Sequence, residues 1–479
     1  MTNAPFMLNV DCDMFANNPE VILHAMCLLL GFDHDLMSGF VQYPQRFYGA
    51  LQDDPFGNQL VVAQHFVARG MDGLQGFLYA GTGCFHRRKI MYGAAPEVER
   101  DGQGTKFQEA KGKPSPQELQ RRLGSSRELQ ESAAEIMWGA LTKTTVDVKG
   151  PTARLEAAKQ VAGCTYETNT CWGKEVGWVY GSTNEDVQTG LRIHAMGWQS
   201  TFLEIDPPAF LGSAPIGGPA SMTQYKRWAS GLLEVLVGRN SPLLFFLTRK
   251  LCFRQCFTYL LFNVWPLRSV PELCYAMLAP YCAIANTSFI PKASEPTVVV
   301  PAILFVFYNV HTLTEYLECG LSARAWWNNQ RMVRIIAVTA WLFGLLSGIA
   351  KILGLSETTF EVTRKDQNMS TNSTADDKED PRRFTFDASP IFLSGTTVVL
   401  LNLVALPVCL LKVLGSSLVF TSDDGPGIGE LVCSGWVVLS FWPFVRGLLG
   451  KGSYGLPWPT IVKASLLASL FLLLCKWTS

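Results

Sequence analysis

Three short groups of polar residues have types and spacings that could do chemistry. The first is Asn184-Glu185-Asp186, which opens a run with helical periodicity. Ser182 and Glu185 have the S-x-x-E spacing of a capping box, which predicts a helix start with Asp186 in its first turn. The exposed N–H groups and the helix dipole there favour an ionised carboxylate. Such a carboxylate suits a general base, although the same residues could simply cap the helix.

The second group is a pair of carboxylates, Asp11 and Asp13, that directly follows the strand-like run Pro5–Val10. In open α/β sheets, ligands bind at the carboxyl ends of the strands. Two carboxylates beside a diphosphate can hold a hard divalent cation, which neutralises charge on the leaving group. The spacing therefore predicts a site for Mg²⁺ or Mn²⁺, although D-x-D is also common in ordinary turns.

The third group lies on a helix that we expect over Ser221–Val237. Gln224, Arg227 and Trp228 stand at i, i+3 and i+4, so they share one face. Arginine can bind a diphosphate through two N–H groups, tryptophan can stack on a sugar ring, and glutamine can fix a hydroxyl. In the alternative interpretation Ser221 and Gln224 form a capping box and Trp228 belongs to the core.

These three groups occur in the order found in processive family-two glycosyltransferases, and the sequence resembles plant cellulose synthase-like proteins. The stretches Cys164–Thr170 and Gly218–Trp228 resemble the H subfamily most. The resemblance covers nearly the whole chain. It implies an α/β glycosyltransferase domain of the GT-A type, incomplete at its N-terminus, followed by an α-helical transmembrane region.

The resemblance implies a processive inverting enzyme that extends a β-glucan from UDP-glucose and passes it across the membrane for cell-wall synthesis. The polymer would be cellulose or mixed-linkage (1,3;1,4)-β-glucan. By resemblance Asp186 is the general base, with Glu185 beside it in the substrate site. Asp13 is the direct metal ligand, and Asp11 binds both the metal and the nucleotide. Gln224, Arg227 and Trp228 hold the growing end.

Two further segments join the expected site by resemblance. Thr82 and Gly83 lie in a Gly-rich loop that adjoins the acceptor sugar in the family, although an ordinary turn would look the same. The segment 360–365 resembles the family's F-x-V-T-x-K gating loop, and its substrate-contacting residues would be Phe360, Val362, Thr363 and Lys365.

Composition divides the chain into two parts. Hydrophobic residues make up 48% of its 479 residues, and the mean hydropathy is +0.15. We expect a cytosolic domain over 1–240, with a variable charged insertion at 97–159 that carries one or two helices, around 117–123 and 127–137. Residues 241–479 form the expected membrane domain. Its five predicted spans are Phe257–Ala283, Val298–Leu317, Ile391–Leu411, Leu431–Leu449 and Thr460–Leu474.

Two further apolar segments are expected to lie at the membrane surface, 243–255 and 333–355. In the second, Arg334 and Lys351 leave only sixteen uncharged residues between them, 335–350. A crossing there would also put the 360–365 loop on the wrong side. Asn286 is then extracytoplasmic, while the sequons at 368–374 are cytosolic.

The expected partners are a UDP-sugar, the growing β-glucan and membrane lipid, with a homo- or hetero-oligomer left open. The expected location is the Golgi and endomembrane system, with the plasma membrane as the alternative. Lys and Arg number 40, as do Asp and Glu, so no nucleic-acid-binding charge is visible. The thirteen cysteines lack zinc-site spacing and are interpreted as reduced thiols.

The resemblance also implies that two membrane helices, and strands carrying the first Asp of the catalytic set, precede Met1. We therefore expect an N-terminally truncated chain, which leaves a catalytically inactive family member as one alternative. A transferase for a lipid or small-molecule acceptor is another. A transporter is disfavoured because no predicted span carries a central charge pair.

Overall fold

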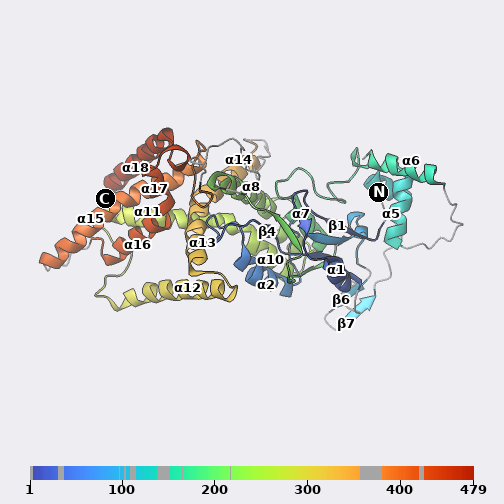
Figure 1. Ribbon diagram of the computed structural model, residues 1–479, viewed down its shortest axis with the longest axis horizontal. Helices are drawn as coiled ribbons and strands as arrows, with labels where there is room; N and C mark the ends of the chain where they lie inside the picture. The colour runs from blue at the N-terminus through green and yellow to red at the C-terminus, as the bar shows by residue number, and fades with distance from the viewer. Residues whose placement is uncertain are drawn as a thin grey trace. The chain divides into compact units, whose positions relative to one another are not determined.

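The computed structural model describes residues 4–30, 37–96, 98–101, 104–107, 115–138, 150–163, 165–215, 217–355, 380–419 and 425–478 (Figure 1). Its contacts form two compact units. Unit 1 comprises Met1–Tyr48, Ala63–Ser213 and Glu234–Asn263, and unit 2 comprises Gly49–Val62, Ala214–Leu233 and Val264–Ser479. Unit 2 thus includes two segments, 49–62 and 214–233, from the sequence expected to form the soluble domain.

A four-stranded mixed sheet forms the centre of unit 1, in the order β1-β5-β3-β8. Strand β5 pairs antiparallel with both β1 and β3, and β3 pairs parallel with β8. Strands β1, β3 and β8 therefore end at the same edge. The strands are β1 (Phe6–Asn9), β3 (Ser38–Gln42), β5 (Cys84–Arg87) and β8 (Gln199–Phe202). The expected strand before Asp11 is confirmed, while the GT-A assignment stays a prediction.

Two smaller sheets accompany it. One has the order β2-β9-β4, from Phe15–Ala16, Phe210–Ser213 and Arg46–Tyr48, and the other is the hairpin of β6 (Val98–Asp101) and β7 (Gly104–Phe107). Buried aromatic side chains from several elements pack against the central sheet, among them Phe40, Phe85 and Trp198. This packing holds the edge of the sheet at which Asp11 and Asp13 follow β1.

The helices of unit 1 include the two expected in the charged insertion. They are α4 (Pro116–Leu123), which Ser115 caps by accepting the Glu118 N–H at 3.2 Å, and α5 (Arg127–Trp138). The others lying wholly in unit 1 are α1 (Val21–Leu30), α2 (Arg69–Gly73), α3 (Arg88–Met91), α6 (Pro151–Ala162), α7 (Glu185–Ala195), α9 (Pro242–Leu247) and α10 (Phe253–Asn263). Leu123, Leu129, Ala133 and Met137 form a small core of their own with Tyr92.

Unit 2 is helical in its described residues. Besides most of α8 (Gly218–Val237), its helices are α11 (Ser269–Ala285), α12 (Val299–Glu318), α13 (Ala323–Ile336), α14 (Leu342–Ile352), α15 (Ile391–Val419), α16 (Ile428–Ser440), α17 (Trp442–Leu449) and α18 (Trp458–Thr478). By length and composition, four helices in the described part of the chain could cross a membrane, or five if the bent pair α16–α17 is one span.

Two segments that we expected to form continuous helices, 243–255 and 257–283, are each interrupted. The segment 243–255 is divided between α9 and α10, because Arg249 adopts a left-handed conformation (φ 58°) just after α9 ends. The expected span 257–283 is interrupted by a 3-10 turn at Trp265–Arg268, which contains Pro266. The pieces α10 and α11, of 11 and 17 residues, are each shorter than the roughly 20 residues that a span needs.

The segment 323–352 is longer than the expected 333–355. Helix α13, which Ser322 caps, begins at Ala323, ten residues before 333, and continues into α14 to residue 352. At 30 residues it is long enough to cross, so its length does not argue against a span. Half of its apolar window is nevertheless buried inside the protein, whereas none is for Pro296–Glu318. Its expected position at the membrane surface stays a prediction.

The packing of this segment explains its burial. A methyl group placed on Gly344 would lie 2.5 Å from the Ala229 Cβ, and one on Gly348 would lie 2.9 Å from Leu233 Cδ2. Both contacts are to helix α8 (Gly218–Val237). Small residues four positions apart let two helix backbones approach closely. Glycines on α14 therefore hold α8, the helix of the Q-x-x-R-W group, in place.

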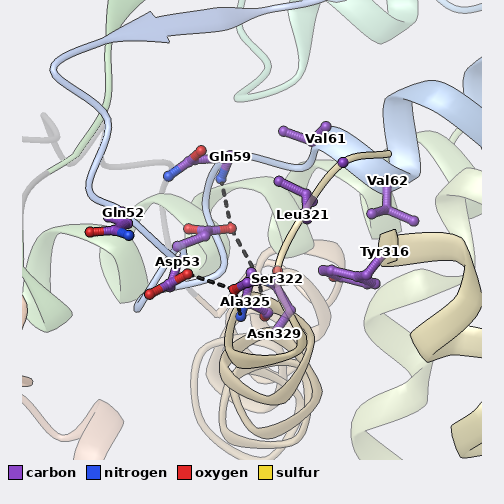
Figure 2. A pocket seen from close by; sticks show the side chains of 12 residues that line it. Gln52, Asp53, Gln59, Val61, Val62, Tyr316, Leu321, Ser322, Ala325 and Asn329 are labelled. Atoms are coloured by element: carbon purple, nitrogen blue, oxygen red, sulfur yellow. Dashed lines mark hydrogen bonds between the residues drawn. The ribbon is translucent and has the colours of Figure 1, made fainter. Parts of the chain in front are cut away.

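A pocket of about 290 Å³ in unit 2 lies where residues 52–62 meet the start of α13 (Figure 2). Its carboxylates are engaged within the protein. Ser322 donates to Asp53 at 2.6 Å, and Asn329 donates to Asp54 at 3.2 Å. Burial raises the pKa of Asp54, and hydrogen bonds from Asn329 and backbone N–H groups oppose that shift. These contacts fasten the 52–62 segment to α13.

Candidate active site

The loop Tyr79–Gly83 lies beside the D-x-D pair because of strand pairing. Asn9, the last residue of β1, pairs with Cys84, the first of β5. The turn that follows β1 therefore meets the loop that precedes β5. The Asp11 N–H donates to the Thr82 hydroxyl at 2.9 Å, and that hydroxyl donates to the Met14 sulfur at 2.9 Å. Thr82 is buried, so its hydroxyl serves the D-x-D turn.

Asp186, from helix α7, contacts the same loop at Gly81. It stands in the first turn of α7, as expected, and its Oδ1 accepts the Val187 N–H at 2.7 Å. Gly81 has φ 86°, and a methyl group placed on it would lie 3.1 Å from Asp186 Oδ2. The carboxylate therefore packs directly on the glycine backbone. Asp186 is half-buried and Glu185 is exposed.

The capping box predicted for this helix is wrong. Asn184 occupies the N-cap position and makes no side-chain cap hydrogen bond. Ser182 lies two residues before the N-cap position, and its hydroxyl accepts instead from the Asn184 N–H at 3.2 Å and from Gln188 Nε2 at 2.9 Å. The first-turn position of Asp186 thus depends on where α7 begins and does not need the predicted cap.

Three polar residues that the sequence analysis missed complete this part of the site. The Tyr79 hydroxyl donates to the Gly81 carbonyl at 3.0 Å and accepts from Trp178 Nε1 at 3.4 Å. The Asn9 amide donates to both the Tyr79 hydroxyl and the Gly81 carbonyl. Burial raises the pKa of Tyr79 far above its usual value, and the charge of Asp186 adds to that shift. Tyr79 therefore remains a neutral hydrogen-bond donor.

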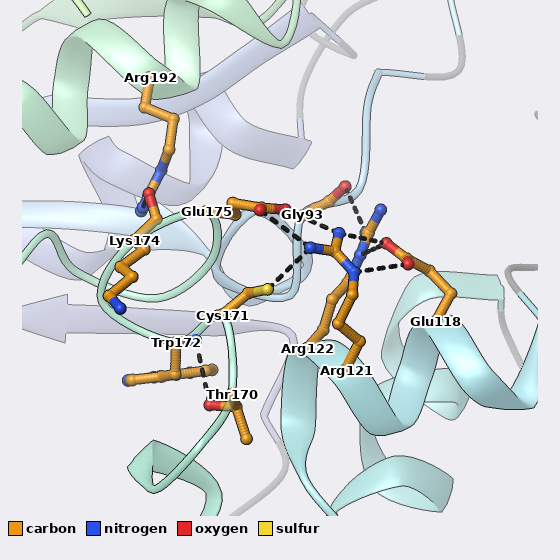
Figure 3. A network of polar contacts seen from close by, with 10 residues as sticks. All are labelled: Gly93, Glu118, Arg121, Arg122, Thr170, Cys171, Trp172, Lys174, Glu175 and Arg192. Carbon is orange, nitrogen blue, oxygen red and sulfur yellow. Dashed lines mark hydrogen bonds and ion pairs between the residues drawn. The ribbon is translucent and has the colours of Figure 1, made fainter. Parts of the chain in front are cut away.

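An ion network fastens the segment before Asp186 to the insertion (Figure 3). Arg121 of α4 binds Glu175 through two N–H groups, at 2.9 and 2.7 Å, and donates to the Cys171 sulfur at 2.8 Å. Hydrogen bonds from Arg121 and Arg122 lower the pKa of Glu118 to about 2. The network is largely exposed, as expected for a charged insertion. It nevertheless contacts the loop that leads into α7, at Cys171 and Glu175.

The Q-x-x-R-W group lies in unit 2, on α8, which begins at Gly218. Ser221 is therefore inside the helix, and the alternative interpretation of Ser221 and Gln224 as a capping box is wrong. Gln224, Arg227 and Trp228 are partly exposed on the helix. The Trp228 ring packs edge-to-face on Tyr225, with centroids 5.3 Å apart, and contacts the core of unit 2. The alternative interpretation of Trp228 as a core residue is thus partly right, and its sugar contact stays a prediction.

The remaining expected site residues are distributed as follows. Gly83 is buried, with φ 61°. Phe360, Val362, Thr363 and Lys365 lie outside the described residues. Within the described residues, no three His, Cys, Asp or Glu side chains form a metal-binding group. Asp11 is exposed and Asp13 half-buried, so a cation there would draw its remaining ligands from substrate phosphates or water, as Mg²⁺ commonly does.

Comparison with known proteins places the whole chain among related sequences. A family model described as cellulose synthase matches residues 1–112 and 97–478. Cellulose synthase-like proteins H2 and H1 of Oryza sativa subsp. japonica are 54% and 53% identical to it, over 99% of this chain and 62% of each relative. Cellulose synthase-like protein B4 of Arabidopsis thaliana is 40% identical over the same shares. The chain thus spans about three fifths of the length of these relatives.

Proposed function

Because the chain belongs to the cellulose synthase family, we propose that it is the glycosyltransferase and membrane part of an enzyme that extends a β-glucan from UDP-glucose. The observation that carries the proposal is the loop Tyr79–Gly83. It adjoins the D-x-D turn through Thr82 and the carboxylate of Asp186 through Gly81. Metal-binding and general-base candidates, far apart in sequence, therefore meet within unit 1.

In the proposed reaction Asp186 accepts the proton of the acceptor hydroxyl. The oxygen attacks the anomeric carbon in line, the bond to UDP breaks, and the configuration inverts from α to β. A half-buried carboxylate at a helix N-terminus is stabilised as the anion, which suits a base. The neutral Tyr79 hydroxyl and the Asn9 amide hold the Gly81 carbonyl and so keep the loop against Asp186.

The D-x-D residues would hold the divalent cation. Asp11 and Asp13 offer only oxygen donors, which match Mg²⁺ or Mn²⁺. When bound, the cation would neutralise charge that develops on the UDP leaving group. Thr82 fixes the Asp11 backbone, so the start of the D-x-D turn is held by the same loop that contacts Asp186.

We also propose that α8 presents Gln224, Arg227 and Trp228 to the growing glucan at the cytosolic membrane surface. The close packing of α8 on Gly344 and Gly348 supports this arrangement. A helix that carries Lys226 and Arg227 belongs on the water side of the membrane, so α14 would lie along that side. The membrane would be that of the Golgi and endomembrane system or the plasma membrane, with the polymer crossing among the spans.

The experiment is Asp186→Asn in the full-length gene product. We expect incorporation of radiolabelled glucose from UDP-glucose to fall at least 1,000-fold, because the amide cannot accept the proton, while UDP affinity changes less than threefold. Glu156→Gln, an exposed carboxylate on α6, is the matched control and should leave both unchanged. Near-normal incorporation by Asp186→Asn would refute the general-base role. Failure of the unmodified protein to transfer glucose would refute the enzyme assignment.

A further inference from the structure

Gln42 is a buried amide at the end of β3 that hydrogen-bonds the Tyr79–Gly83 loop at Ala80, Thr82 and, at 3.4 Å, Gly83, and also the carbonyl of Tyr43. Its side chain has no exposed surface. Nε2 donates to the Thr82 carbonyl at 2.7 Å and to the Tyr43 carbonyl at 2.9 Å, and Oε1 accepts the Ala80 N–H at 3.0 Å. The partners fix the orientation of the amide, since carbonyls face the NH₂ group and an N–H faces the oxygen.

The bonds to Ala80 and Thr82 flank Gly81 on both sides. The main chain adds one more link, from the Tyr43 N–H to the Gly83 carbonyl at 3.0 Å. Gly81 is the residue on which Asp186 packs, and Thr82 is the residue that holds the Asp11 N–H. Gln42 therefore braces the Tyr79–Gly83 loop, which touches both candidate groups, and it does so from the end of strand β3 in the central sheet.

We propose that Gln42 is a positioning residue that sets the distance between the D-x-D turn and Asp186 by fixing residues 80–83. The inference rests on the proposed glycosyl transfer, because it assigns Gln42 a role in that reaction. Gln42 contacts neither reacting atom. Its effect passes through the loop: the amide must both donate and accept, so a hydrocarbon or a carboxylate side chain cannot replace it.

The matched control is Gln255 of α10, a second buried amide of unit 1. Its Nε2 donates to the Gln75 carbonyl at 3.0 Å and to the Trp198 carbonyl at 3.3 Å. Gln42→Leu and Gln255→Leu each remove a buried amide that donates to backbone carbonyls. Both should lower thermal stability, Gln42→Leu by more because the Ala80 N–H also loses its acceptor. Only Gln42→Leu should disturb the Tyr79–Gly83 loop.

Two readouts, made on the full-length protein, separate positioning from stability. Hydrogen exchange of the 80–83 amides should accelerate at least tenfold in Gln42→Leu and stay within threefold of normal in Gln255→Leu. For transfer from UDP-glucose, kcat should fall about 100-fold in Gln42→Leu with KM changed less than threefold, since a displacement of about 1 Å costs that much. Gln42→Asn, which keeps the amide on a shorter side chain, should recover part of kcat.

A double variant tests whether Gln42 acts through Thr82. Thr82→Val should lower kcat because the Asp11 N–H loses its acceptor, and Gln42→Leu/Thr82→Val should be no more than threefold worse than the poorer single variant. Independent, multiplicative losses would overturn the proposal, as would equal loss of kcat in Gln42→Leu and Gln255→Leu. If the unmodified protein transfers no glucose, the proposed function fails, while unchanged exchange at 80–83 in Gln42→Leu separately refutes the bracing of the loop.

Discussion

Two buried histidines of unit 1 should lower the stability of the protein in acid to a similar extent, but replacing them should change that stability in opposite directions. His86 of β5 and His194 of α7 are both buried, and burial lowers the pKa of each to about 3. The ring nitrogens of His194 pair with the Tyr259 and Ser200 hydroxyls, at 2.8 and 3.1 Å. Neither ring nitrogen of His86 has a hydrogen-bond partner. We expect His86→Phe to stabilise the protein and His194→Phe to destabilise it.

The magnitude follows from the pKa values and the missing hydrogen bonds. The folded pKa lies below the unfolded value of about 6.5, so the unfolded state binds more protons between pH 6.5 and 3. Each histidine therefore costs about 1.4 kcal/mol of stability per pH unit as pH falls below 6.5. At pH 7.5 an unpaired buried polar group costs about 1–3 kcal/mol. His86→Phe should recover about 1 kcal/mol at pH 7.5 and about 2 kcal/mol at pH 5.5.

The assay is hydrogen exchange of the β3 and β5 amides in the full-length protein at pH 5.5 and 7.5, corrected for intrinsic rates. Exchange reports the local opening free energy without requiring two-state unfolding of the whole chain. The edge-to-face contacts of His86 with Tyr79 and Trp178, at 4.7 and 6.4 Å, show an aromatic surrounding that suits a Phe ring. Lower protection in His86→Phe at pH 7.5, or an unchanged pH dependence, would refute the reasoning.

Three further predictions concern the site and the membrane topology. Gly81→Ala should reduce glucose transfer at least tenfold, because its methyl would crowd the proposed general base, whereas Gly49→Ala, also at positive φ (61°) but with nothing within 4 Å, should transfer normally. Trp228→Ala should shorten the product chains while UDP affinity stays within threefold, and the reverse pattern would refute the sugar contact. In glycosylation mapping Asn286 should carry a glycan and the sequons at 368–374 should not. Glycan at 368–374 would make 323–352 a true span and end the gating-loop assignment.

Local signals in the sequence correctly predicted the elements whose causes are local. The apolar run before Asp11 forms β1, and helices form in the insertion at the expected positions, as α4, which Ser115 caps, and α5. The capping box predicted at Ser182 and the alternative one at Ser221 are wrong for one reason. An S-x-x-E or S-x-x-Q spacing indicates that a helix starts near the serine but does not fix its first residue. Helix α7 begins three residues after Ser182, at Glu185, and α8 begins three residues before Ser221, at Gly218.

The contacts that assemble the candidate site depend on tertiary structure, so spacing did not reveal them. Gln42, Tyr79 and Asn9 act on the Gly81 loop only because β1, β3 and β5 are neighbours, with β5 between the other two. The sequence offered one local signal. Two strands end in a polar residue, β1 in Asn9 and β3 in Gln42, and the carboxyl ends of strands form the edge where ligands bind. Similarly, charge placement along 323–352 does not reveal that glycines on one face pack against α8.

The separate core of the charged insertion has a consequence for how this part of the molecule moves. Helices α4 and α5 pack on Tyr92 with their own apolar side chains. Their polar attachment to the Cys171–Glu175 stretch includes an exposed ion pair between Arg121 and Glu175 and a hydrogen bond from the Cys171 N–H to the Arg121 carbonyl at 2.9 Å. Exposed pairs weaken as added salt screens them. The two helices should therefore open as a local unit more readily than the central sheet, and added salt should weaken the ionic part of their contact with the polypeptide leading to α7.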